Sequence, residues 1–160
     1  MKISIQPIRP DFAGEVHGAD LRMPLSKEHV ATIEQGMDRY AVLVFRDQHL
    51  SDDEQIAFTQ NLGPLENAQG GNITKDDEYR LKQGMIDVSN LDKNGNPFDR
   101  SDRRRMFNLG NRLWHSDSSY RAIPAKYSLL SARTVATRGA IPNSPICARP
   151  TMLSMTKCVR

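Results

Sequence analysis

The sequence predicts an α+β fold with a sheet or barrel core. Helical patterns come early, strand patterns surround and follow them, and long polar loops separate the elements. At 160 residues and 18.0 kDa the chain is long enough for one domain with a sizeable core. Its 38% hydrophobic and 26% charged residues suit a globular protein.

A strand pattern opens the chain and a helix follows over residues 27–39. Ile3 and Ile5 alternate with polar residues in KISIQPI, which is typical of a strand. Ser26 suits a helix N-cap, and helical spacing continues behind it. The apolar residues on one face of this predicted helix are Val30, Ile33 and Met37.

A buried strand and a second helix come next. AVLVF (41–45) is a continuous run of β-branched and aromatic residues, which indicates a strand covered on both faces. Ser51 and Glu54 have capping-box spacing, and Gly63-Pro64 stops the helix that they open.

Loops dominate the middle of the chain. Residues 66–84 and 91–105 are rich in polar and turn-forming residues, whereas MIDVSN (85–90) and KYSLLSA (126–132) predict strands. The LWHSD stretch between them has an extended pattern. From residue 138 onward the chain has three prolines, no acidic residue and no periodicity, which predicts a disordered tail.

The net charge of +3 comes from the tail. Residues 138–160 hold four basic residues, which leaves 18 basic against 19 acidic residues in 1–137. We therefore expect no nucleic-acid partner. No apolar run approaches the roughly 20 residues that span a bilayer, and no secretory signal opens the chain. The expected location is the cytoplasm, without membrane contact.

His115 and Asp117, in NRLWHSDSSY, are the candidate metal ligands. On an extended chain, residues i and i+2 point to the same face, so an imidazole and a carboxylate would meet there. Two such ligands and a distant second histidine make the facial triad that holds ferrous iron and leaves open positions for other ligands. The residues alone leave open a chance pairing among four histidines.

Longer segments carry a family resemblance. NRLWHSDSSYRAIPAKYSLLSAR and MDRYAVLVFRDQHLSDDEQIAFTQNLGPLE resemble the iron- and 2-oxoglutarate-dependent dioxygenases of the TauD/TfdA family, especially the 2,4-dichlorophenoxyacetate branch. DVSNLD (87–92) also has a counterpart. The resemblance implies a double-stranded β-helix (jelly roll, clavaminate synthase-like) with N-terminal helices, truncated here after the His-x-Asp region.

The resemblance also implies the chemistry and the site. Fe(II), 2-oxoglutarate and O2 would hydroxylate a small organic acid of the aryloxyacetate type and release succinate and CO2. His115 and Asp117 would bind the iron, Asn111 would lie near the substrate, and Trp114 would pack beneath the metal strand. The family's cosubstrate threonine and arginine and its distal histidine have no counterpart here, so the cosubstrate-binding residues are unknown and we expect little activity from this chain.

A second reading frame accounts for the missing threonine. Codons that join the third base of one residue to the first two of the next permit GGDTEFADMRAAYDALDD after residue 137, with the threonine codon across Ile141 and Pro142. We therefore hypothesise a frameshift near residues 136–138. Residues 1–137 would be the N-terminal part of the dioxygenase domain, and 138–160, which hold both cysteines, an aberrant tail.

A small non-enzymatic binding module is the alternative function. Its strongest feature is RSDRRR (100–105), although interleaved acidic residues favour a solvated loop. His49 as a substitute iron ligand is the weaker alternative for the site. A homo-oligomeric full-length parent is left open.

Overall fold

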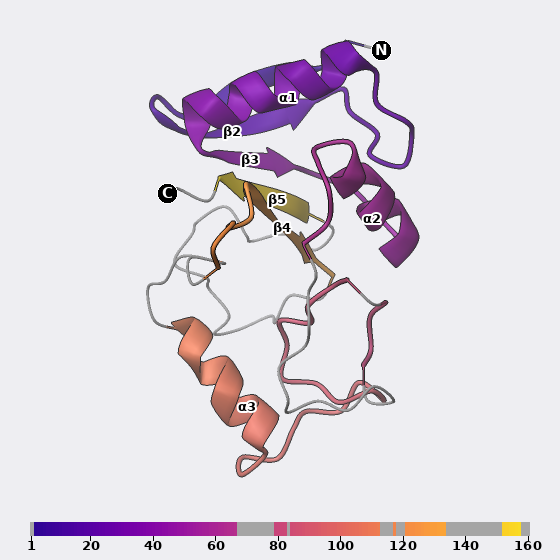
Figure 1. Ribbon diagram of the computed structural model, residues 1–160, viewed down its shortest axis with the longest axis vertical. Helices are drawn as coiled ribbons and strands as arrows, with labels where there is room; N and C mark the ends of the chain where they lie inside the picture. The colour runs from indigo at the N-terminus through magenta and orange to yellow at the C-terminus, as the bar shows by residue number, and fades with distance from the viewer. Residues whose placement is uncertain are drawn as a thin grey trace. The chain divides into compact units, whose positions relative to one another are not determined.

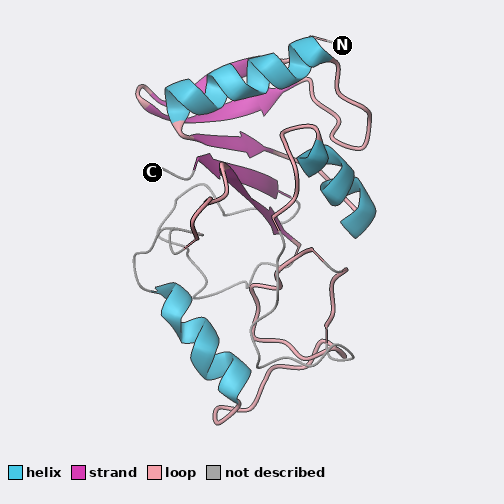
Figure 2. Cartoon of the chain, viewed as in Figure 1, coloured by secondary structure: helices cyan, strands magenta, loops and turns pink. Residues whose placement is uncertain are grey.

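The computed structural model describes residues 2–66, 79–82, 84–112, 117, 121–133 and 152–157. It has two compact units, one formed by Met1–Pro64 with Asp117–Arg160 and the other by Leu65–Ser116. The first holds β1 (Ser4–Arg9), β2 (Phe12–His17), α1 (Lys27–Tyr40), β3 (Val42–Phe45), α2 (Asp52–Gln60), β4 (Tyr127–Ala132) and β5 (Met152–Lys157). The second holds α3 (Arg103–Asn108) and the short 3-10 helix η2 (Leu109–Arg112). Figure 2 distinguishes helices, strands and loops.

The five strands form one mixed sheet in the order β1-β2-β3-β5-β4 (Figure 1). β1 and β2 are antiparallel, β2 and β3 are parallel, and β5 is antiparallel to both of its neighbours. β3 and β4 therefore run in the same direction with β5 between them. Helices beside a mostly antiparallel sheet agree with the predicted α+β class. None of the described helices is long and apolar enough to cross a bilayer.

Helix α1 begins and packs as predicted. The Ser26 hydroxyl accepts a hydrogen bond from the His29 backbone N–H at 3.2 Å, which satisfies one of the free donors of the first turn. Ile33 and Met37 are completely buried. Gly36 in α1 and Gly14 in β2 allow the helix to lie close to the sheet, because a Cβ at either position would meet the side chain of Ile5.

Helix α2 has the predicted capping box. Glu54 donates its backbone N–H to the Ser51 hydroxyl at 3.3 Å, and the Glu54 carboxylate accepts the Ser51 backbone N–H at 2.8 Å. Hydrogen bonds that the Glu54 carboxylate accepts from the backbone N–H and the hydroxyl of Ser51 lower the pKa of Glu54. Phe58 on this helix is buried and meets Phe45 of β3 edge-on, with ring centroids 5.7 Å apart.

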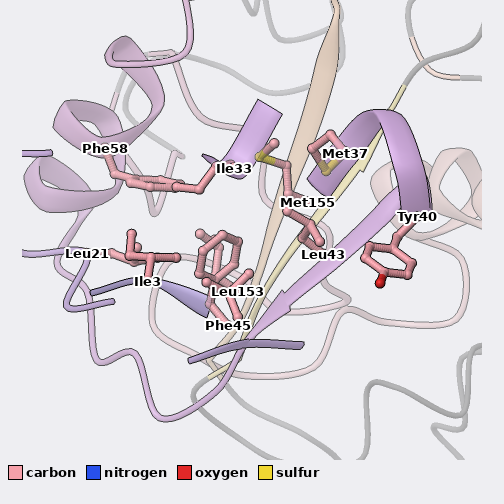
Figure 3. Packing of buried hydrophobic residues seen from close by; sticks show 11 residues of the cluster. Ile3, Leu21, Ile33, Met37, Tyr40, Leu43, Phe45, Phe58, Leu153 and Met155 are labelled. Atoms are coloured by element: carbon pink, nitrogen blue, oxygen red, sulfur yellow. The ribbon is translucent and has the colours of Figure 1, made fainter. Parts of the chain in front are cut away.

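The core lies between the sheet and the two helices (Figure 3). Its side chains come from strands and helices that are far apart in the sequence. They include Ile3, Leu21, Ile33, Met37, Tyr40, Leu43, Phe45, Phe58, Leu153 and Met155. Leu153 and Met155, both on β5, have no exposed surface.

The tail prediction is therefore wrong for Met152–Lys157. These six residues form β5, a strand paired on both sides, where the sequence predicted disorder. Leu153 and Met155 alternate with polar residues, as in a strand. This alternation is too short to stand out in a tail that has no other pattern. The remaining tail residues, 138–151 and 158–160, lie outside the described residues.

Three further elements differ from the predictions. β2 was not predicted, because Gly14 and the left-handed Ala13 (φ 62°) interrupt its pattern. Residues 85–90 form no strand, and Ile86 and Val88 are 71% and 57% exposed. α3 begins within the predicted loop 91–105 and was not predicted, because a six-residue helix presents too few turns for a periodic signal.

Candidate functional site

Helix α3, in the Leu65–Ser116 unit, precedes the predicted ligand segment in the chain. The Asp102 carboxylate caps it by accepting the Arg104 backbone N–H at 2.8 Å. The Arg104 guanidinium binds the same carboxylate at 2.8 Å and lies 4.3 Å from the centre of the Phe98 ring. Hydrogen bonding from Arg104 lowers the pKa of Asp102. One arginine thus fixes both the helix start and the preceding loop.

The loop before α3 is itself held by backbone hydrogen bonds. The Asp92 carboxylate accepts the backbone N–H groups of Asn94 (2.9 Å) and Asn96 (2.8 Å), which lowers the Asp92 pKa. The Asn108 side-chain amide donates to the Ser89 carbonyl at 2.8 Å, so the end of α3 is tied to this loop. The chain therefore enters η2 from a well-anchored position.

The structure describes some of the predicted site residues and not others. Asp117 is exposed and lies in a turn, not in the extended segment that the sequence predicted. Serine and aspartate favour turns because their side chains bond nearby backbone groups, and Asp117 has a serine on each side. The backbone of Asn111 lies in η2. His115 and Trp114 lie outside the described residues, so the His115–Asp117 pairing stays a prediction.

Two ion pairs fix β4, the strand that follows the ligand segment. At its start Lys126 donates to Glu34 of α1 at 2.7 Å, and this hydrogen bond raises the pKa of Lys126 to about 12. After its end Arg133 donates to Asp52 of α2 at 2.6 Å. Opposite charges therefore link both ends of β4 to the two helices.

An open cleft of about 350 Å³ lies where β3 and β4 end. Its lining residues are Gln48, His49, Leu50, Ser51, Ser131, Ala132 and Arg133. The Arg133 guanidinium also reaches Gln55 at 3.4 Å, and its charge is already matched by Asp52. The cleft is thus lined by both polar and apolar residues, and the positive charge of Arg133 is balanced by Asp52.

A second, more polar hollow of about 270 Å³ lies beside His49. Gln48, one of its lining residues, accepts the Leu21 backbone N–H at 3.1 Å and donates to the carbonyls of Ala19 (3.1 Å) and Arg46 (3.0 Å). Among the described residues, no three His, Cys, Asp or Glu side chains gather around a metal-sized site. His115 lies outside the described residues, so His49 as a substitute ligand stays untested.

Gln48 and Arg133 are cleft residues that sequence reasoning missed. The available signal was position: Arg133 directly follows a predicted strand and Gln48 comes three residues after another, and loop residues that follow scaffold elements often line binding sites. Neither belongs to a spacing pattern that would single it out from a surface residue.

Asp20 in the second hollow predicts an acid-sensitive contribution to stability. Its carboxylate accepts three hydrogen bonds from Arg22, which lower its pKa from 3.8 to about 2. Because the Asp20 pKa is lower in the folded than in the unfolded protein, ionised Asp20 stabilises the fold at pH values above the unfolded-state pKa. This contribution is lost as the pH falls from about 4 through about 2. Urea midpoints measured across this range should fall less steeply for Asp20→Asn than for the parent. Arg22→Met should flatten the profile in part, because it removes the guanidinium but keeps the backbone N–H donor. A parent-like slope in both variants would contradict the assignment.

The fold and the ligand segment together correspond to a known enzyme family. The chain belongs to the taurine catabolism dioxygenase TauD, TfdA family, whose model matches residues 4–147. This confirms the resemblance seen in the sequence. The match also extends beyond residue 137, where the dioxygenase part was expected to end.

Two curated relatives are alpha-ketoglutarate-dependent 2,4-dichlorophenoxyacetate dioxygenases. The one from Cupriavidus pinatubonensis is 43% identical over 141 residues, covering 87% of this chain and 48% of the relative. The one from a Burkholderia species is 41% identical over 134 residues, covering 82% of this chain and 44% of the relative. The chain thus spans less than half the length of these relatives.

A solved structure is similar over the same region. The crystal structure of AAD-2 in complex with Mn(II) and N-oxalylglycine matches with a TM-score of 0.77 and 53% identity. The match covers 84% of this chain and 47% of that protein. Sequence and structure therefore agree on the family.

Proposed function

We propose that the full-length parent of this chain is a cytoplasmic Fe(II)- and 2-oxoglutarate-dependent dioxygenase that hydroxylates a small organic acid of the aryloxyacetate type. The observation that carries the proposal is the 43% identity, over 87% of this chain, to a 2,4-dichlorophenoxyacetate dioxygenase. We also propose the family's jelly roll as the complete fold, of which strands β1 to β4 are one part.

The chemistry of the predicted ligands fits a ferrous ion. An imidazole and a carboxylate two residues apart are the donor types of the 2-His-1-carboxylate triad, and the exposed Asp117 is accessible to an ion. When bound, iron would couple O2 and 2-oxoglutarate to substrate hydroxylation, with succinate and CO2 as the other products. N-oxalylglycine, present with AAD-2, differs from 2-oxoglutarate only by NH in place of CH2, which supports the same cosubstrate here.

The chain's own residues would orient the reactants. His115 and Asp117 would fix the metal at the chain segment between η2 and β4, and Asn111 would contact the substrate. Arg104 supports α3 before this segment in the sequence, and two ion pairs link the ends of β4, after it, to helices α1 and α2. The protein would thus position the metal and the substrate, and the metal would supply the redox chemistry.

We also propose that a frameshift separates the chain from its remaining ligands, and that the 160-residue chain alone has little activity. The support is the GGDTEF reading permitted after residue 137. Resequencing the gene checks this directly: nucleotides that cannot encode GGDTEF in the shifted frame would contradict it.

Metal binding tests the ligand assignment. In the frame-restored protein, His115→Ala or Asp117→Ala should weaken anaerobic Fe(II) binding by at least about tenfold. Losing a residue that merely orients a metal ligand typically costs about 10–100-fold, and these two residues would touch the metal itself. Succinate formation with 2,4-dichlorophenoxyacetate should fall in parallel. A titration monitored by the absorbance of the Fe(II)–2-oxoglutarate complex reports the binding of the metal and of the cosubstrate together.

His49→Ala is the matched control for these variants. It removes an exposed imidazole that lines both clefts but is not a proposed ligand, so Fe(II) affinity and turnover should match the parent. Loss of binding in His49→Ala with retention in His115→Ala would overturn the assignment. Substantial 2-oxoglutarate-dependent turnover by the 160-residue chain would overturn the proposal that it is inactive.

The alternative binding module gains little from the structure. Arg104 is used by Asp102 and Phe98, and Arg105 donates to the Arg100 carbonyl at 3.1 Å. These contacts account for two arginines of RSDRRR as local supports of α3. They favour the structural role over nucleic-acid binding.

A further inference from the structure

β5 occupies a slot between two parallel strands of the sheet. On one side it pairs with β3 through registers that include Leu43↔Met155 and Phe45↔Leu153. On the other side it pairs along all six residues of β4, from Tyr127↔Lys157 to Ala132↔Met152. Without β5, the facing edges of β3 and β4 would each expose a row of unpaired backbone groups.

The slot also recognises side chains. Leu153 and Met155 have no exposed surface and pack in the same cluster as Leu43 and Phe45, while Leu129 of β4 packs against this cluster. Figure 3 shows Leu153 and Met155 among these core residues. An occupant must therefore be an extended segment, antiparallel to β3 and β4, with apolar residues at positions i and i+2.

We propose that this slot is a strand-accepting site and that a second copy of this chain can fill it with its own Met152–Lys157. Exchange between two copies preserves both ladders and both buried side chains, because donor and acceptor have the same sequence in each copy. Only the connection over residues 133–151 has to be redirected. Extended, that length of chain spans up to roughly 60 Å, which is sufficient to reach a neighbouring molecule.

The position of β5 in the chain favours this exchange. Leaving the slot breaks two ladders but moves no other described strand, since β1 to β4 all precede β5. The β1–β2 hairpin is different, because its strands are joined by a connection too short to separate them. The hairpin therefore serves as an internal control that cannot exchange.

Engineered disulfides in the full chain distinguish the two cases. One variant carries Ala132→Cys and Met152→Cys, which face each other across β4 and β5, and the control carries Gln6→Cys and Glu15→Cys across the hairpin. Cys147 and Cys158 are replaced by serine in both. Each protein is incubated at high concentration in mild urea, returned to native buffer and oxidised, and its mass is read on a non-reducing gel.

The proposal expects covalent dimers from the β4–β5 variant and only monomers from the hairpin control. Mixed ¹⁵N-labelled and unlabelled pools should give a dimer of intermediate mass by native mass spectrometry. Adding Leu153→Asp should abolish that dimer. Monomers alone in the β4–β5 variant, with residues 152–157 protected from hydrogen exchange, would show that the strand stays with its own chain and would overturn the proposal.

A peptide experiment tests the same slot without cysteine substitutions, in case the engineered variants fail to fold. A biotinylated peptide of residues 150–157 is added to the unmodified full chain during the same urea cycle. Retention of this peptide on the chain, and loss of retention for a peptide with aspartate in place of Leu153, supports the slot as the binding site. Equal retention of both peptides, or no retention of either, would overturn it.

Discussion

Leu153→Ala should lower the free energy of unfolding by about 2–5 kcal/mol. Leu153 lies in β5 with no exposed surface and packs in the cluster that holds Phe45, so its truncation leaves a cavity in the centre of the sheet. A typical domain is stable by only about 5–15 kcal/mol, so this one change removes a large share of the total. Urea denaturation followed by circular dichroism measures the loss.

Leu130→Ala is the matched control for this prediction. Leu130 is the same residue type on the neighbouring strand β4, but it is 50% exposed, so its truncation should cost much less than that of Leu153. Equal and small effects for the two variants would mean that residues 152–157 form no core strand in solution. The comparison thus distinguishes a core strand from the disordered tail that the sequence predicted.

Phe45→Ala should cost about 3–5 kcal/mol. The ring is completely buried on β3 and meets Phe58 of α2 at an interplanar angle of 72°, an arrangement that stabilises aromatic pairs beyond their buried area. Its loss removes the contact between the sheet and α2 as well as the filling of the core. Thermal and urea unfolding should both shift strongly.

Phe12→Ala provides the comparison for Phe45. Phe12 is 49% exposed at the start of β2, so the same truncation should lower stability by a fraction of the Phe45 effect. In the double variant Phe45→Ala/Phe58→Ala, the cost should be less than the sum of the single costs, because the two rings share one contact. Strict additivity would contradict the paired role of the rings.

Elements with strong local signals were predicted correctly. The Ser26 cap and its apolar face identified α1, the capping box identified α2, and continuous or alternating apolar runs identified β1, β3 and β4. Each of these patterns lies within a single helix or strand and can be recognised from a short stretch of sequence. Local chemistry was sufficient because the tertiary contacts reinforce the same conformation.

Elements stabilised by distant partners were missed. β5 depends on β3, which precedes it by roughly 110 residues, and Leu153 and Met155 are the buried residues among the β5 side chains that the structure describes. α3 depends on Asp102 and on the stacking of Arg104 over Phe98, and an arginine-rich sequence conceals both. Conversely, residues 85–90 have a strand pattern, but Ile86 and Val88 face outward.

The candidate site was predicted mainly through family resemblance. Spacing alone proposed His115 and Asp117 but left chance open, and Asp117 proved to lie in a turn. A metal site assembled from distant segments has no local signature for its last ligand, because that ligand's spacing depends on the whole topology. The family match to residues 4–147 supplies the context that two residues cannot.

The strand order has a consequence for biosynthesis. Residues 127–132 leave the ribosome before residues 152–157, yet among the described strands β4 joins the sheet through β5 alone. At about 5–20 residues per second, the roughly 25 residues from 133 to 157 take about 1–5 s to translate. During that interval the emerging β4 segment lacks the one strand that pairs with it in the described part of the chain. Chaperone demand should therefore depend on the translation speed of codons 133–157.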